Sequence, residues 1–90
     1  METIQGAERV LKALANRRRL AILLYVHRVG KTPVGHIAKE IRLSLKATSK
    51  HLGILYSAGL LDKEQIALSV LYSLKMPVHP VTKIILQILK

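Results

Sequence analysis

Two chemically different faces run along the segment between residues 44 and 61. With about 100° of rotation per residue, a helix here carries an apolar stripe opposite a polar, cationic one. The apolar stripe contains Leu45, Thr48, Leu52 and Leu55, and the cationic stripe contains Lys46, Ser49, Lys50 and Gly53. Lysine can reach a guanine edge or a phosphate in a DNA groove. The pattern predicts a helix over about 45–57 that docks on a core by one face and offers Lys46, Ser49 and Lys50 to the DNA major groove.

The charge of the chain also points to a polyanion. Its 90 residues include fifteen Lys and Arg against five Asp and Glu, for a net charge of +10. Eleven of the basic residues, but only one acid, Glu40, lie between Arg9 and Lys50. Such a balance favours DNA, RNA or an anionic membrane surface. Three tyrosines offer few stacking platforms for RNA, and the basic residues do not form one long interfacial helix. Double-stranded DNA is therefore the predicted partner.

Helix starts in the basic region could hold DNA phosphates, because free N–H groups and the helix dipole attract anions there. Ser44 is the expected N-cap of the 45–57 helix. Thr32 and His36 stand at the start of the short helix before it. All three side chains are therefore candidate phosphate contacts.

An arginine cluster, Arg17–Arg19, opens another helix at the end where cations are unfavourable. Phosphate binding, or pairing with acids elsewhere, explains the cluster better than helix stability does. We expect Arg19 to be partly buried and structural. The candidate DNA-binding residues are Lys46, Ser49, Lys50, Ser44, Thr32, His36, Lys39, Arg42, Arg17 and Arg18.

Capping and breaking residues divide the chain into helices and one hairpin. Asn16 is a predicted N-cap and Gly30 a predicted C-terminal stop, and Thr32-Pro33 predicts another helix start with proline in the first helical position. Alternation between residues 60 and 76 predicts an antiparallel hairpin with its tip near Ala67 and Leu68. Helices are expected at 3–14, 17–29, 33–41, 45–57 and 81–90. Two short helices joined by about three residues indicate a helix-turn-helix in a mostly α fold with a small β-hairpin (α+β).

The length of the chain predicts one domain over residues 1–90 with a small core. Half of the residues are hydrophobic, and the absence of cysteine excludes disulfides, zinc-thiolate sites and thiol redox sensing. We therefore expect a second subunit to cover apolar surface on the terminal helices, 3–14 and 81–90, with packing inside one chain as the alternative. The predicted dimer contacts are Ile4, Ala7, Val10, Leu11, Leu14, Ile84, Ile85, Ile88 and Leu89.

Catalysis and metal binding find no support in the sequence. It contains no phosphate-binding glycine loop, nucleophile elbow, paired carboxylates or metal-ligand spacing, so we expect no enzyme, no cofactor and no metal site. We expect His27 and His51 to lie on apolar faces as core residues and His36 to be exposed. No signal peptide and no membrane-spanning apolar run is evident, so a cytoplasmic protein is expected.

Two local motifs resemble the ArsR family of winged helix-turn-helix regulators. The segment LKALANRRRLAILLYV, residues 11–26, is similar to that family's second-helix entry, and LSLKATSKHLGILYSAGLL, residues 43–61, is similar to its recognition helix. The resemblance implies a homodimeric, sequence-specific DNA-binding transcriptional regulator, with repression expected, that dimerises through its first and last helices. Metal sensors of the family use cysteines at the third helix or His and acidic ligands on the last one, and this chain has neither set.

The predicted wing differs from the Gly- and Arg-rich tip usual in that family. Its tip, residues 64–69, reads Glu-Gln-Ile-Ala-Leu-Ser, which is apolar and slightly acidic. Such a tip suits a phosphate backbone poorly, so it could touch a protein partner or the core of its own chain. The alternative function is accordingly a winged-helix protein–protein interaction module whose wing binds a partner, with DNA binding incidental.

Overall fold

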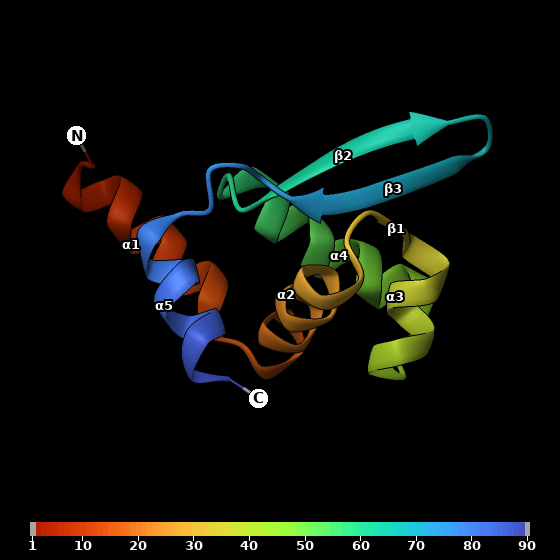
Figure 1. Cartoon of the computed structure of the whole chain (residues 1–90), viewed down its shortest axis with the longest axis horizontal. Coiled ribbons are helices and arrows are strands. Elements are labelled where there is room, and N and C mark those ends of the chain that lie inside the picture. Colours follow the sequence, from red (N-terminus) through yellow and green to blue (C-terminus); the bar gives the residue numbers. More distant parts are fainter. Residues whose placement is uncertain (1, 90) are drawn as a thin grey trace.

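The computed structural model describes residues 2–89, which form five helices and a three-stranded antiparallel sheet (Figure 1). The helices are α1 (Ile4–Leu14), α2 (Arg17–Val29), α3 (Val34–Ile41), α4 (Leu45–Ser57) and α5 (Pro80–Ile88). The strands are β1 (Thr32–Pro33), β2 (Leu61–Ile66) and β3 (Ser69–Leu74). The predicted order of helices and hairpin is confirmed. None of the helices within residues 2–89 is both long and apolar enough to cross a membrane.

The helix ends follow the predicted caps. The Asn16 side chain accepts two backbone N–H bonds from the first turn of α2, and the Ser44 hydroxyl accepts one from Ala47 at 3.1 Å. Gly30 ends α2 with φ 79°, a backbone angle that suits glycine because it has no Cβ. At the other end of the chain, α5 begins at Pro80 and ends at Ile88, so Leu89, which was predicted to be helical, lies past its end. Residue 90 lies outside the described residues.

The hairpin has the predicted antiparallel pairing and tip. Leu61 pairs with Leu74, Ile66 pairs with Ser69, and the chain reverses at 67–68 with Ala67 at φ 55°. Figure 1 shows this hairpin, the wing, reaching away from the end of the molecule where α1 and α5 lie.

The sequence-based assignment of Thr32 and Pro33 to a helix start was wrong. Both residues are extended and form β1, which pairs with Tyr72 and Leu71 of β3. The residue before a proline is biased towards extended backbone, and proline without an N–H is tolerated on an edge strand. The helix α3 therefore begins only at Val34, and Pro33 at its N-cap position makes no side-chain capping bond.

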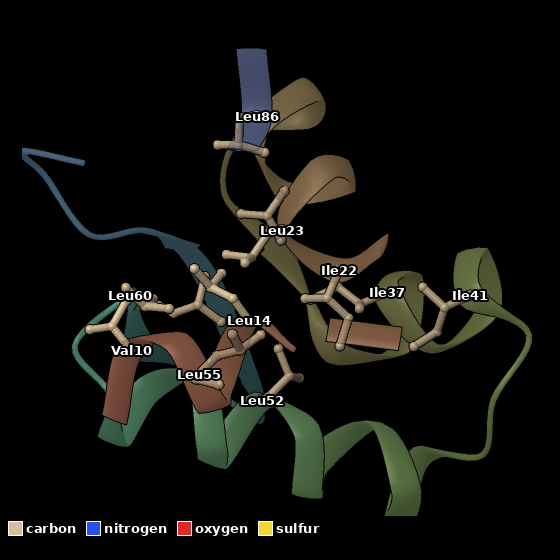
Figure 2. Packing of buried hydrophobic residues seen from close by; sticks show 13 residues of the cluster. Val10, Leu14, Ile22, Leu23, Ile37, Ile41, Leu52, Leu55, Leu60 and Leu86 are labelled. Carbon is tan, nitrogen blue, oxygen red and sulfur yellow. The ribbon is translucent and has the colours of Figure 1, made fainter. Parts of the chain in front are cut away.

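The core is built around α2, which lies centrally in Figure 1. This helix contacts all four other helices and also β3. Figure 2 shows Ile22 and Leu23 of α2 inside a cluster that Leu52 and Leu55 of α4 complete, with Leu86 of α5 beside Leu23. Burial of such side chains contributes about 1.5–3 kcal/mol each. Packing against α2 therefore fixes the orientation of α4.

The terminal helices divide their apolar residues between this core and solvent. Val10 and Leu14 are buried in the cluster, so their assignment to a dimer contact was wrong: one chain already uses them. Ile4 is 92% exposed, Ile84 56% and Ile88 66%, and Leu11 is also exposed. Ala7, Ile85 and Leu89 are partly buried. An apolar face on α1 and α5 therefore remains uncovered in the single chain.

Candidate nucleic-acid interface

The helix α4 has one buried face and one exposed face, as predicted. Thr48, Leu52 and Leu55 are fully buried against the core. Lys46, Ser49, Lys50 and Gly53 are all exposed on the opposite side. No heavy atom outside the immediate backbone lies within 4 Å of where a Cβ on Gly53 would stand, so this face is open. The packing thus holds α4 rigidly while leaving its cationic face free to contact a ligand.

Leu45 is a correction to the predicted apolar stripe, because its side chain is 58% exposed. It occupies the first turn of α4, and Leu43 in the preceding turn packs against the core in its place. Leu45 therefore adds an apolar group next to Lys46 on the exposed surface.

The turn between α3 and α4 gathers polar groups at the start of α4. Arg42 takes a left-handed conformation, φ 56°, and ends α3, and the Leu43 N–H donates to the Ala38 carbonyl at 3.0 Å. Lys39, Arg42 and Ser44 are exposed around this turn, and His36 is exposed on α3 as predicted. The N-terminus of α4 therefore stands among cations, an arrangement that attracts anions.

Thr32 departs from its predicted role, and Arg18 has a structural contact in addition to its predicted one. Thr32 is only 4% exposed within β1, so the assignment of its hydroxyl to a phosphate contact was wrong. One amino group of Arg18 donates to the Ile41 carbonyl at 2.9 Å and so caps the end of α3, although the residue remains exposed. Arg17 is exposed and makes no side-chain hydrogen bond within residues 2–89.

Arg19 is partly buried and structural, as predicted. Its Nε donates to the Ala13 carbonyl at 2.5 Å, and its second amino group donates to the Lys12 carbonyl at 3.1 Å. These are two of the four carbonyls that the end of α1 leaves without helical partners. The Ala15 and Asn16 N–H groups bond the carbonyls of Leu11 and Leu14, so all four are satisfied.

Arg19 also contacts α4 through His51. Its first amino group lies 3.2 Å from His51 Nδ1, and because arginine only donates, Nδ1 must accept. Burial lowers the pKa of His51, and the positive charges of Arg19 and then Arg18 lower it further. The lowered pKa and the accepting Nδ1 both favour the neutral imidazole of His51. It is half-buried and bonded, close to the predicted core role.

His27 does not have the core position predicted for it. Its side chain is exposed in the last turn of α2, past the point where the apolar stripe of that helix meets the core. Within residues 2–89, no cluster of three or more His, Asp or Glu side chains could hold a metal ion.

A groove between α1 and α4 contains cations that sequence reasoning did not select. It has a volume of about 700 Å³, and Arg9 and Lys12 of α1 line it together with Lys50 and Gly53 of α4. Lys12 makes a long contact of 3.8 Å with exposed Glu8. The groove exists only once α1 packs against α4, so the sequence alone does not reveal it. The one indication in the sequence was that the basic region begins at Arg9, on the α1 side of the groove.

The wing tip is apolar and solvent-exposed. Leu68 is fully exposed and Ile66 is half exposed, so the prediction that the tip could rest on its own core was wrong. Glu64 pairs with Lys31 at 2.6 Å, and Lys63 stands 4.4 Å above the ring of Tyr56 on α4. Lys63 and Glu64 thus attach the wing to the rest of the domain, whereas Ile66 and Leu68 at its end remain exposed.

A helix-turn-helix with an exposed cationic second helix and a β-hairpin beside it defines a winged helix-turn-helix protein. Residues 16–63, more than half of the chain, match the family described as bacterial regulatory protein, arsR family. The chain therefore belongs to the ArsR family, whose members are DNA-binding transcriptional regulators and not enzymes.

Similar proteins agree with this assignment. The chain is 36% identical over 71 residues to the HTH-type transcriptional regulator YgaV of Escherichia coli K12, covering 79% of this chain and 72% of that protein. It is 38% identical over 65 residues to the transcriptional activator HlyU of Vibrio cholerae, covering 72% of this chain and 59% of HlyU.

Solved structures show the same fold. HlyU from Vibrio cholerae N16961 superposes with a TM-score of 0.79 at 32% identity, over 93% of this chain and 87% of that one. The homodimeric winged helix-turn-helix DNA-binding domain of Mb0332 from Mycobacterium bovis superposes with a TM-score of 0.80 at 28% identity, over 94% of this chain and 75% of that one.

Proposed function

We propose that this regulator binds double-stranded DNA as a homodimer and places α4 of each protomer in a major groove. The observation that carries the proposal is the division of α4 into a fully buried apolar face and an exposed face of Lys46, Ser49 and Lys50. A helix fixed by its buried face loses little freedom when its other face meets DNA. Such rigid presentation favours base recognition over loose electrostatic attraction.

The side chains proposed to contact DNA divide into base-reading groups on α4 and phosphate-holding groups around it. Lys46, Ser49 and Lys50 stand on the face that would meet base edges, and Leu45 could contact a thymine methyl group. The groups proposed to hold phosphates surround this face: Ser44 at the helix N-terminus, His36, Lys39, Arg42, Arg17 and Arg18, with Arg9 and Lys12 added from the α1–α4 groove. Phosphate contacts would set the register and base contacts the sequence.

The proposed dimer uses the uncovered apolar face of α1 and α5. Ile4, Ile84 and Ile88 are more than half exposed and Leu11 adds to them, with the partly buried Ala7, Ile85 and Leu89 at the edges. A second copy of the chain is the partner that would cover this face, and the Mb0332 domain is itself described as homodimeric. A two-fold dimer presents two α4 helices to half-sites about one helical turn, or roughly 10 base pairs, apart.

We expect such a dimer to repress, because it would cover promoter DNA that polymerase needs. HlyU is named as an activator, so a reporter assay must decide whether this chain represses or activates transcription. Deletion of the gene should raise transcription from the bound promoter, and a fall would indicate activation. DNA binding would place the protein in the cytoplasm.

Selection from a random pool of duplex DNA tests the proposal. The expected product is an inverted repeat with half-site centres about 10 base pairs apart. Lys50→Ala should weaken binding to that site by about 1–3 kcal/mol if Lys50 reads a base. Lys75→Ala, an exposed lysine away from α4, is the matched control. Equal loss on every sequence would reassign Lys50 to a phosphate, and no enriched site would contradict base recognition.

The exposed wing tip supports a second contact, with a protein. Ile66 and Leu68 expose apolar surface that is unsuited to phosphates. In a pull-down, Ile66→Ser combined with Leu68→Ser should abolish capture of the partner protein that the wild-type chain retains. The circular dichroism spectrum of the double variant should match that of the wild type. Retention of the captured protein by the double variant would refute a wing contact.

A further inference from the structure

A cleft of about 520 Å³ lies between the end of α2, α5 and the connector that joins β3 to α5. Its apolar walls come from Met76, Pro77 and Val78 of the connector and from Leu86 of α5. Leu86 is buried and forms the floor, and Figure 2 shows it beside Leu23 of α2. The volume falls within the range of about 300–1,000 Å³ typical of small-molecule sites.

The polar groups at this cleft are cationic or neutral. Lys83 lines it from α5 and His27 from α2, and no acidic side chain takes part in the lining. Lys83 forms no ion pair within residues 2–89, in contrast to Lys12, Lys31 and Lys75. An uncompensated ammonium beside apolar walls complements a ligand with one anionic group and a hydrocarbon body.

The cleft stays open in the proposed dimer. Successive residues of a helix point about 100° apart, so Lys83 lies roughly 100–140° around α5 from Ile84 and Ile88, whereas Gln87, about 60° from Ile84, stands at the border of that apolar side. A separate hollow on the α1 side of α5 is lined by Leu11 and Val81. A partner seated on the apolar face of α1 and α5 would therefore leave the Lys83 side accessible.

We propose that this cleft binds a small amphipathic carboxylate, with the carboxylate on Lys83 and the hydrocarbon part against Val78 and Leu86. The same helix forms one wall of the cleft and part of the proposed dimer contact. A ligand that fills the cleft would therefore shift α5 against α2 and change the spacing of the two α4 helices. This consequence for DNA affinity rests on the proposed function, whereas ligand binding itself does not.

Titration of the full chain with octanoate tests the site, with octanol and octylamine as neutral and cationic probes of equal length. Backbone amide NMR shifts should change near residues 27, 76–78 and 83–87, and octanoate should bind about tenfold or more tighter than either other probe. Lys83→Gln should remove that preference, whereas the matched control Lys75→Gln should keep it. No shift at millimolar octanoate, equal binding of the three probes, or unchanged binding to Lys83→Gln would each overturn the proposal.

A second arm separates this site from the DNA proposal. Saturating octanoate should change the affinity of the wild-type dimer for its selected duplex by about fivefold or more, and that of Lys83→Gln should not change. Amide shifts without an effect on DNA affinity would keep the ligand site and overturn its regulatory role. Loss of DNA binding with no ligand present would count against the proposed function alone.

Discussion

Arg19 joins three helices, and its removal should strongly destabilise the chain. It donates to two carbonyls at the end of α1 and to His51 of α4, from the first turn of α2. A hydrogen bond from a charged donor contributes about 1.5–3 kcal/mol. The bonds to Ala13 and His51 are partly buried, and the bond to Lys12 is exposed, where water can replace the guanidinium. We therefore expect Arg19→Ala to lower the free energy of unfolding by about 2–4 kcal/mol in total.

That loss is large for a domain of this size, whose total stability is on the order of 5–13 kcal/mol. The melting temperature should fall by about 8–32 °C, since 1 kcal/mol corresponds to roughly 4–8 °C in small domains. Urea unfolding followed by circular dichroism measures the change directly. Arg17→Ala is the matched control, because Arg17 lies on the same turn of α2 without any side-chain bond within residues 2–89.

Arg19→Lys provides the graded test. Lysine keeps the positive charge but lacks the planar guanidinium that reaches both carbonyls. The stability of Arg19→Lys should therefore lie between that of the wild type and that of Arg19→Ala. If Arg19→Ala unfolds at the same urea concentration as Arg17→Ala, the carbonyls at the end of α1 do not depend on Arg19 and the reasoning fails.

Three further predictions follow from buried and exposed side chains. Among residues 2–89, the buried hydroxyls of Thr48 and Thr82 find no hydrogen-bond partner. Thr48→Val and Thr82→Val should therefore each raise the free energy of unfolding by up to about 1 kcal/mol in urea melts, and a loss of stability would show that the hydroxyls are satisfied. Burial and neighbouring arginines depress the pKa of His51 below its ordinary value of 6.5, so the unfolded chain takes up this proton first as the pH falls. Stability should therefore be full above pH 6.5 and decline below it until the lowered pKa is passed, and a His51→Gln variant with the same pH profile would contradict this. Ile84→Glu with Ile88→Glu should give a folded monomer in sedimentation equilibrium, and a dimer that persists would move the interface elsewhere.

Local chemistry explains why much of α4 could be predicted from sequence. Ser44 supplies a capping oxygen, and Thr48, Leu52 and Leu55 repeat at helical spacing, so both the start and the buried face of the helix are encoded within a few residues. The same reasoning correctly predicted the caps at Asn16 and Gly30.

Features that depend on distant partners were missed. Thr32 and Pro33 read locally as a helix start, but β3, some 40 residues later, recruits them as a strand. Periodicity also does not reveal where a core ends, which is why Leu45 and His27 were expected inside and lie outside. The groove that brings Arg9 to the side of Lys50 likewise exists only after α1 packs on α4.

The exposed face of α4 is proposed to read DNA within a dimer that also holds several phosphates. Fluorescence anisotropy of labelled duplexes, with the selected site compared with a scrambled sequence across a salt series, tests it most directly. We expect preference for the selected site and a logarithmic salt slope of about −5 to −11, since roughly 6–12 phosphate contacts per dimer would release counterions. Equal binding of both duplexes, or a slope near zero, would contradict it.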